Sequence, residues 1–498
     1  MNKITILLVL AGSIAINVYS QTVSLDNTFG QNGIAKFSNA SDVSLLDFDT
    51  HGNIIAVGYT LIGGGKHHLT IAKTSADGII DKSFGNNGLV KVTDYDKSMP
   101  YGLKITDDNK IVVIGSFTKV QFQGHETIIM RFNENGTVDE DFGDKGKVNL
   151  NFNTGYLMSL NLENDNFMLI AKQEGETVEE NGNLYYIHTG YSISKYNYQG
   201  EIDETFGENG IVFSSINEPT TISPYCMKIL NNGSIVIAGT YNTWPNTELG
   251  FCKLTSSGDL DTGFAEGGIW HKNIMQDFDL DHELFSNVFE DSEGNLILSG
   301  SGLKNSLGWG NRAFLSKFSP NGTFDTSFGE EGFYCFDSIS INKPIIQIGD
   351  KYLTAGWNPW NSHYQITIVN NDGSAANVAY TCEIYYFQDM KRQGTNKIIL
   401  GGGYEQMNFS DNFALERVVI DLETSINLNN YSSNVIIFPN PVKENLYFNT
   451  EIAFEIIDIQ GRILLSSVTP VKSVNIGSLR TGVYFIRFGN SVQKFTKE

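Results

Sequence analysis

The nine residues Ile80-Asp-Lys-Ser-Phe-Gly-Asn-Asn-Gly88 show how this chain is organised, because the chain contains six copies of their pattern. Each copy reads Asp-x-x-Phe, then Gly (Ala in one copy), with another Gly soon after. An Asp side chain accepts hydrogen bonds from backbone amides two residues on, and Gly permits the positive φ of tight turns. The phrase therefore predicts a turn whose Phe packs on the core. The copies begin, with a mean spacing of about 60 residues, at Asp26, Asp81, Asp139, Asp203, Asp261 and Asp325.

A second, apolar phrase recurs between copies of the first. It is a turn followed by a short apolar run, as in Ser234-Ile-Val-Ile-Ala-Gly239, and seven such runs can be read if the weaker Phe167–Ala171 is included. Short runs that are rich in β-branched residues and bounded by turns predict strands buried on both faces; a helix is the alternative for any single run. Three further strands can be read around each run. The pattern predicts an all-β fold with a β-propeller of about seven blades, and an open solenoid is the rival arrangement.

The first phrase also resembles a known repeat family. Ile80–Gly88 and Ile202-Asp-Glu-Thr-Phe-Gly-Glu-Asn-Gly210 are similar to the delta-60 repeat of bacterial surface and secreted proteins, and the resemblance covers most of residues 22–428. It implies a propeller-like β array without defined catalytic residues. The last two units depart from the pattern, because Asn370-Asn-Asp-Gly-Ser374 continues without the phrase and the seventh unit ends at Asp421-Leu-Glu423. The way the ring closes is therefore an open question at this point.

Residues 434–498 follow a different pattern. Val435-Ile-Ile-Phe-Pro-Asn-Pro441 and the short, partly alternating segments after it predict a small Ig-like β-sandwich. Phe438-Pro-Asn-Pro-Val442, Ile459-Gln-Gly-Arg462 and Leu479-Arg-Thr-Gly-Val-Tyr-Phe-Ile486 resemble the type A sorting domain of the type IX secretion system. The resemblance implies contact with the type IX machinery, translocation across the outer membrane, and then release or attachment at the cell surface. A plain Ig-like accessory domain is the alternative.

The first 20 residues predict a signal peptide. Lys3 gives a positive end, Ile4 to Ile16 is an apolar run, and Ser20 offers a small residue at the cleavage position. An uncleaved anchor is the alternative. No later stretch reaches the ~18 apolar residues that a transmembrane helix needs. We therefore expect an extracellular or outer-membrane-surface protein with no transmembrane segment.

The charge of the chain limits its partners. Lys and Arg number 34 against 56 Asp and Glu, so the formal net charge is −22. A field of this sign repels nucleic-acid phosphates, which makes nucleic acid an unsuitable partner. Solubility outside the cell is the simplest explanation of the acidic balance.

No catalytic, metal-binding or phosphate-binding motif stands out. The histidines lack HExxH spacing, no Gly-x-Ser-x-Gly elbow is present, and the cysteines show no CxxC pair. We therefore expect no cofactor, no metal, no catalytic residues and no enzymatic activity. A site assembled across blades would escape such a search, so an extracellular polysaccharide hydrolase or lyase at a channel mouth is the alternative. Buried or incidental thiols, with one disulfide as the other option, are expected at Cys226, Cys252, Cys335 and Cys382.

Aromatic residues gather in the loops that follow the apolar runs. Aromatic rings beside Asn and Gly suit stacking on sugars or packing against a protein, although they can also pin long loops onto the blade below. We therefore expect a secreted or cell-surface binding or scaffold protein whose loops recognise a glycan or a protein; a spacer that binds nothing is a further option. The expected binding residues are Trp244, Trp309, Trp357, Trp360 and Tyr404.

Overall fold

The computed structural model divides the chain into two compact units, Thr22–Asp421 and Leu422–Glu498 together with Met1–Gln21. Every regular element in the part of the chain that the structure describes is a β-strand. Among the same residues, no helix is long and apolar enough to cross a membrane. The described residues are 21–498 except 120–125, 151–156, 163–166, 181–182, 198, 200, 216–221, 242–247, 275–281, 305–309, 337–339, 342–343, 359–362, 385, 405–412, 423–434, 459–461 and 489–490.

The unit Thr22–Asp421 consists of antiparallel strand groups that follow one another along the chain. The first two groups are β3 (Asp42–Phe48), β4 (Ile54–Leu61), β5 (His67–Thr74) and β6 (Leu89–Val92), then β7 (Lys97–Ile105), β8 (Ile111–Thr118), β9 (Glu126–Phe132) and β10 (Lys147–Asn149). The next two are β11 (Leu157–Leu162), β12 (Phe167–Glu180), β13 (Asn183–Asn197) and β14 (Ile211–Ser215), then β15 (Ile222–Ile229), β16 (Ile235–Tyr241), β17 (Glu248–Leu254) and β18 (Ile269–Lys272). They are followed by β19 (His282–Glu290), β20 (Leu296–Lys304), β21 (Gly310–Phe318) and β22 (Phe333–Phe336), then β23 (Ser340–Ile341), β24 (Ile346–Ile348), β25 (Lys351–Asn358), β26 (His363–Asn370) and β27 (Ala375–Thr381). The last group is β28 (Tyr386–Gln393), β29 (Lys397–Gly403) and β30 (Phe413–Leu422), joined by β1 (Gln21–Leu25) and β2 (Ile34–Lys36).

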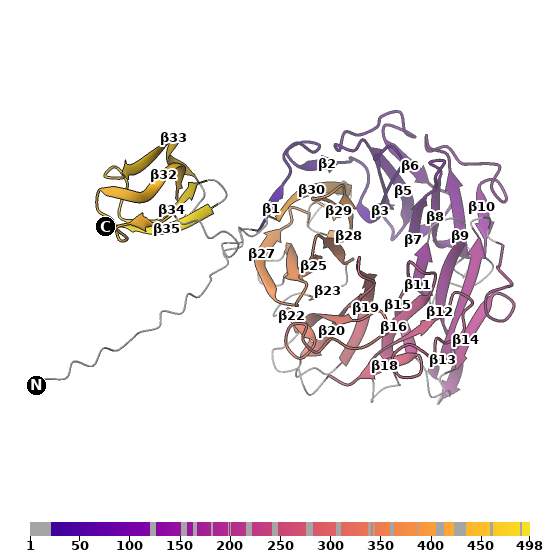
Figure 1. Cartoon of the computed structure of the whole chain (residues 1–498). Helices are drawn as coiled ribbons and strands as arrows, with labels where there is room; N and C mark the ends of the chain where they lie inside the picture. Colours follow the sequence, from indigo (N-terminus) through magenta and orange to yellow (C-terminus); the bar gives the residue numbers. More distant parts are fainter. Residues whose placement is uncertain are drawn as a thin grey trace, which may run out of the picture. The chain divides into compact units, whose positions relative to one another are not determined.

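These groups are arranged around a common centre, with the first strand of each group innermost (Figure 1). The inner strands contact one another in order from β3 through β7, β11 and β15 to β19, and β28 of the last group contacts β3 of the first. The all-β propeller fold is therefore confirmed, whereas the number of seven blades stays a prediction.

The apolar runs form second strands that are buried on both faces, as predicted. In β16, Val236 and Ala238 pack in one hydrophobic cluster and Ile235 and Ile237 pack in another. Each face of the strand therefore meets a different neighbouring sheet. A single sheet could not bury both faces, so contact between successive sheets supplies the core.

The repeated Asp-x-x-Phe-Gly phrase is a turn that also joins neighbouring sheets. In its first copy the backbone N–H of Thr28 donates to Asp26 Oδ1 over 3.1 Å, and Gly30 has a φ of 52°. Ala265, which replaces this Gly in the fifth copy, has a φ of 45°. The backbone N–H of Gly30 donates to the carbonyl of Asp77, in the hairpin turn of the next sheet. Each turn places its Phe in the core, where at most 2% of it is exposed: Phe29, Phe84, Phe142, Phe206, Phe264 and Phe328.

The ring is closed by the N-terminal segment, which answers the question that the sequence left open. β1 and β2 both pair with β30, and the pairs of β2 include Ile34 with Glu416. The first copy of the phrase therefore completes the last strand group, which has no copy of its own. The four cysteines are free thiols, so the alternative of a disulfide does not hold.

The C-terminal unit contains one sheet and its own hydrophobic core. Its sheet has the order β31-β32-β34-β35, and β33 pairs with β32. The core includes Leu446, Ile456 and Ile486, which are fully buried. An Ig-like sandwich stays a prediction for this unit. Its strands are β31 (Ile437–Phe438), β32 (Asn445–Ile457), β33 (Ile463–Asn475), β34 (Gly482–Phe488) and β35 (Ser491–Lys497).

Candidate functional site

Two of the five expected binding residues lie in the described part of the chain. Trp357, in β25, is half-buried, and its ring lies 5.3 Å from that of Tyr364 at 66°. The Tyr364 ring in turn lies 5.6 Å from that of Phe387 in β28. Trp357 is thus part of the packing within and beside its own sheet. The residues outside the described part of the chain are Trp244, Trp309 and Trp360.

Tyr404, the other described residue, lines a cavity at the place where the ring closes. The cavity has a volume of about 600 Å³, and Trp357 is not among the residues that line it. Its walls come from the first Asp-x-x-Phe-Gly turn, from β2, and from the hairpin between β5 and β6. Tyr404 follows β29, so the cavity brings together both ends of the propeller chain. We call it the Tyr404 groove.

A cation lies over the tyrosine ring in this groove. The Nζ atom of Lys36 is 3.1 Å from the centroid of the Tyr404 ring, which is the geometry of a cation–π contact. Lys36 is the last residue of β2, the strand that the N-terminal segment adds to the last group. The pair therefore depends on ring closure.

The other lining residues combine apolar surface with polar groups. Ile79 is 68% exposed and supplies an apolar wall. Gln31, Asn32, Lys82 and Glu383 are exposed and supply hydrogen-bond donors and acceptors. Among the described lining residues two are lysines and one is a glutamate, a balance opposite in sign to the net charge of the whole chain.

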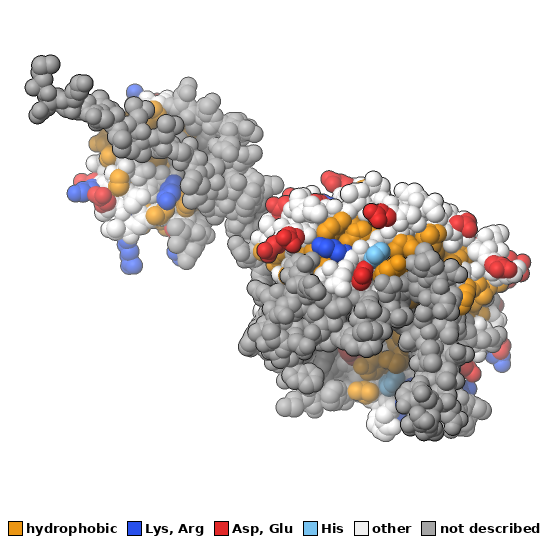
Figure 2. All heavy atoms as spheres, turned by 90° about the horizontal axis from the view of Figure 1, so that it is seen from below, with side chains coloured by type: hydrophobic (Ala, Val, Ile, Leu, Met, Phe, Trp, Pro, Cys, Tyr) orange, Lys and Arg blue, Asp and Glu red, His pale blue; other side chains and the backbone are white. Residues whose placement is uncertain are grey.

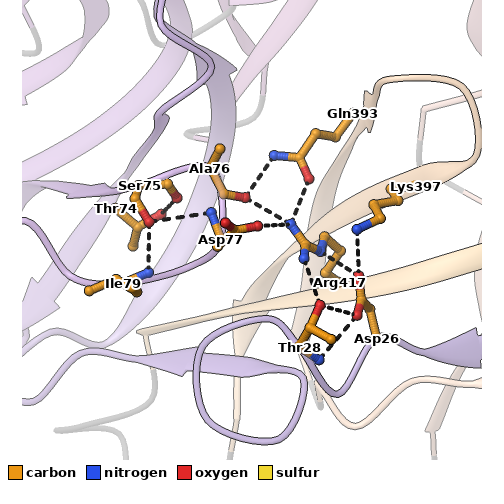
Figure 3. A network of polar contacts seen from close by, with 10 residues as sticks. All are labelled: Asp26, Thr28, Thr74, Ser75, Ala76, Asp77, Ile79, Gln393, Lys397 and Arg417. Carbon is orange, nitrogen blue, oxygen red and sulfur yellow. Dashed lines mark hydrogen bonds and ion pairs between the residues drawn. The ribbon is translucent and has the colours of Figure 1, made fainter.

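A buried arginine fixes the segments behind the groove (Figure 3). Arg417 in β30 is 2% exposed, and its guanidinium lies 4.8 Å from the centroid of the Phe29 ring. Its Nε donates to Asp26 Oδ2 over 2.9 Å, and its Nη1 donates to the carbonyl of Ala76 over 2.8 Å. One side chain thus joins the last strand group, the N-terminal turn and the hairpin of the first group.

Asp26 is held in its charged form within this network. Burial by itself raises the pKa of Asp26, but hydrogen bonds from Thr28 and Lys397 and the charge of Arg417 outweigh burial and bring the pKa well below its ordinary value. Lys397 Nζ lies 3.0 Å from Asp26 Oδ2. The turn that forms one wall of the groove is therefore fixed by ionic contacts on two sides.

A second buried carboxyl group supports the wall that carries Glu383. The backbone N–H groups of Glu383 and Ile384 each donate to Glu416 Oε2 over 3.0 Å, and the Tyr380 hydroxyl donates to Oε1 over 2.7 Å. Burial raises the pKa of Glu416 to about 7, because it penalises the charged form more than these hydrogen bonds favour it. Glu416 has no exposed surface, so it positions the Glu383 segment and does not reach the groove itself.

One group of side chains in the described part of the chain has the spacing of metal ligands. Asp49, His51 and Glu134 can each offer an atom within 4.8 Å of the others. Lys73 Nζ lies 3.0 Å from Asp49 Oδ2 and 3.4 Å from Glu134 Oε1. The two carboxylates thus already share a protein cation, and we treat the group as an ion-pair cluster.

The aromatic-loop pattern found Tyr404 but missed the residues that complete its groove. Lys36, Lys82 and Glu383 belong to other segments of the chain, which only the closed ring brings to Tyr404. One sequence signal was available for Lys36. It stands ten residues after the Asp of a repeated phrase, the position at which each repeat places its outermost strand.

Comparisons with known families match both parts of the chain. A family described as a secretion system C-terminal sorting domain matches residues 436–498. A family described as a β-propeller domain of unknown function matches residues 106–142, 230–264 and 292–328. No curated protein matches the chain.

Solved structures that match this chain have low sequence identity to it. A protein of unknown function from Dyadobacter fermentans is 12% identical, with 78% of this chain and 100% of that chain covered and a TM-score of 0.37. PorZ, a surface component of the type IX secretion system of Porphyromonas gingivalis, is 9% identical, with 90% and 68% covered and a TM-score of 0.31. The β-propeller domain of the Trilobed protease from Pyrococcus furiosus is 12% identical, with 78% and 99% covered and a TM-score of 0.40. The two family matches, together with the ring of strand groups, identify the chain as a β-propeller protein that carries a secretion-system C-terminal sorting domain.

Proposed function

We propose that this protein is a non-catalytic recognition protein that binds an extracellular glycan in the Tyr404 groove. A signal peptide at residues 1–20 and then the type IX machinery would bring it to the cell surface or the medium. The match of residues 436–498 to a sorting domain supports this route. The observation that carries the binding role is the Lys36–Tyr404 pair inside a cavity of about 600 Å³.

The chemistry of the groove suits a sugar. A sugar ring has an apolar face of C–H groups, which packs on an aromatic ring, and hydroxyl groups at its edge, which need hydrogen-bond partners. Ile79 and the face of the Tyr404 ring opposite Lys36 offer the apolar contacts. Gln31, Asn32 and Lys82 offer polar groups around them.

The lining of the groove favours binding over glycoside cleavage. Most glycosidases use two carboxyl groups on either side of the scissile bond. Among the described residues that line the groove, Glu383 is the one carboxylate. The nearby Glu416, despite its raised pKa, is fully buried and accepts three hydrogen bonds from the protein.

The test is a polysaccharide array probed with the full chain from Gln21 and with its Tyr404→Ala variant. We expect the wild type to bind one glycan class and the variant to bind it at least tenfold more weakly, because the stacking surface is lost. Tyr447→Ala is the matched control, since Tyr447 is 44% exposed but lies in the C-terminal unit. Thermal unfolding of each protein checks that the fold persists.

Three results would contradict the proposal. Glycan binding that survives Tyr404→Ala would place the site elsewhere. Capture of a protein ligand without any glycan binding would replace the ligand class. New reducing ends or unsaturated sugars, formed when the wild type is incubated with the bound polysaccharide, would show a hydrolase or a lyase.

A further inference from the structure

A second cavity in the propeller is built from the same repeat positions as the Tyr404 groove. It has a volume of about 690 Å³ and lies between the β15–β18 group and the β19–β22 group. Its walls are the turn that starts at Asp261, the strand β18, and the hairpin turn between β21 and β22. The Tyr404 groove uses the turn that starts at Asp26, the strand β2, and the hairpin between β5 and β6.

Strand register shows that a tyrosine takes the same place in both cavities. In the last strand group, Arg417 of β30 pairs with Ile399 of β29. Lys253 of β17 corresponds to Arg417, and it pairs with Val236 of β16. Tyr404 and Tyr241 each follow these paired residues by five positions. They therefore occupy equivalent sites at the end of the second strand.

A side chain that lies over the tyrosine ring also takes the same place in both cavities. Lys36 stands ten residues after Asp26, and His271 stands ten residues after Asp261. The His271 ring stacks on the Tyr241 ring at 4.1 Å and 13°, as Lys36 lies over Tyr404. His271 Nδ1 lies 2.6 Å from Glu248 Oε2, which holds the imidazole in this orientation.

The repeat by itself does not produce this pair. A third equivalent cavity, of about 620 Å³, lies between the β19–β22 group and the β23–β27 group. Lys317 pairs with Ile297 there, so Gly302, five positions after Ile297, stands at the tyrosine position. Cys335, ten positions after Asp325, stands where Lys36 and His271 stand in the other two grooves. A tyrosine ring covered by Lys or His is therefore a feature of two of these three grooves and not a requirement of the fold.

The second groove also matches the first in its surroundings. Trp270 and Phe324 supply apolar walls, and the exposed Glu266, Asn321 and Thr323 supply polar groups. Trp270 is held in place by Phe318, with the ring centroids 4.8 Å apart at 78°. Figure 2 shows the molecule from below relative to Figure 1. On this side of the propeller, hydrophobic side chains lie beside acidic, basic and histidine side chains.

We infer that the Tyr241–His271 groove is a second glycan-binding site and that the two grooves together bind one polysaccharide with a repeating unit. This inference rests on the function proposed for the Tyr404 groove. β2 and β18 lie on different parts of the rim, so a short sugar reaches one groove, whereas a polymer presents units to both (Figure 1). Engagement of two linked sites raises the apparent affinity by a factor of about 10² to 10⁴ without new contacts.

Affinity electrophoresis of the full chain tests this inference. Native gels contain xylan, alginate, laminarin, dextran or pectic galactan, and the four proteins are wild type, Tyr241→Ala, Tyr404→Ala and the double variant. We expect wild type to be retarded at a polysaccharide concentration at least tenfold lower than either single variant. We expect the single variants to behave alike and the double variant to migrate as in a gel without polysaccharide.

The controls separate a lost site from a lost fold. Glu330→Ala changes the third groove, which lacks the pair, and should bind like wild type. His271→Gln retains Tyr241 but loses the stacked ring, and should resemble Tyr241→Ala if the pair binds the sugar. Retardation that Tyr404→Ala abolishes and Tyr241→Ala leaves unchanged would overturn the second site alone. No retardation of wild type in any gel would overturn the glycan function and, with it, this inference.

Discussion

At the scale of single residues, Glu416 links the stability of the propeller to pH. Burial raises its pKa from 4.5 to about 7, so between these values the folded chain holds a proton that the unfolded chain releases. The stability contributed by this group is therefore fully present below pH 4.5 and is lost as the pH rises through about 7. Asp389, whose pKa burial also raises, acts in the same direction.

Glu416→Gln should reduce this pH dependence. The Gln amide oxygen can accept from the N–H groups of Glu383 and Ile384, and its NH2 can donate to the Tyr380 oxygen, so the three contacts persist without a titrating group. We expect the fall in unfolding free energy from pH 5 to pH 8 to shrink by up to roughly 3 kcal/mol. Urea unfolding at both pH values measures this change in unfolding free energy. Glu383→Gln is the control, because Glu383 is exposed. An unchanged pH slope would show that Glu416 does not titrate in this range.

At the scale of elements, the hairpin glycine of one strand group and the phrase Phe of the preceding group form a tight contact. Gly136 has a φ of 85°, and a Cβ atom added to it would lie 2.6 Å from Val90 Cγ2 and 2.9 Å from the Phe84 ring. Gly63 has nearly the same φ, 83°, but a Cβ there would meet nothing within 4 Å. A substitution at Gly63 therefore tests backbone strain alone. A substitution at Gly136 tests backbone strain together with disturbed packing between strand groups.

Gly136→Ala should destabilise the protein more than Gly63→Ala. Both changes force a Cβ into the left-handed region, at a cost of about 1–2 kcal/mol. Gly136→Ala must also displace Val90 and Phe84, and overpacking of this kind adds about 1–3 kcal/mol. Thermal unfolding should show the larger fall in Tm for Gly136→Ala, and Phe84→Leu should restore part of it. Equal losses at both positions would mean that the contact adds nothing to backbone strain.

The same elements show how far the sequence could predict this structure. The apolar run of β16 and the turn at Ile80–Gly88 follow from local residue patterns, because burial and turn geometry depend on neighbouring residues. The Lys36–Tyr404 pair could not be found in this way. Its two residues are brought together by the pairing of β2 with β30, and local patterns carry no information about contacts between such distant segments.

At the scale of the whole molecule, Arg417 makes the ring depend on its N-terminal residues. Asp26 and Arg417 are 391 positions apart in sequence, yet their ion pair has both side chains at most 8% exposed. Removal of one partner from a buried ion pair leaves an uncompensated charge, at a cost of about 3–5 kcal/mol. The last strand group should therefore be the place where the ring opens first.

Arg417→Met should open the ring at this junction and separate Lys36 from Tyr404 in the groove. We expect hydrogen exchange to speed up in β1, β2 and β30 while β16 and β20 keep their protection, and glycan binding at Tyr404 to fall with it. Lys397→Met, which removes the more exposed partner of Asp26, should have a smaller effect. Asp26→Asn combined with Arg417→Met should recover part of the protection, because no buried charge is then left alone. Faster exchange in every sheet would instead mean that the propeller unfolds as one cooperative unit, so that the ring does not open at this junction before the core unfolds.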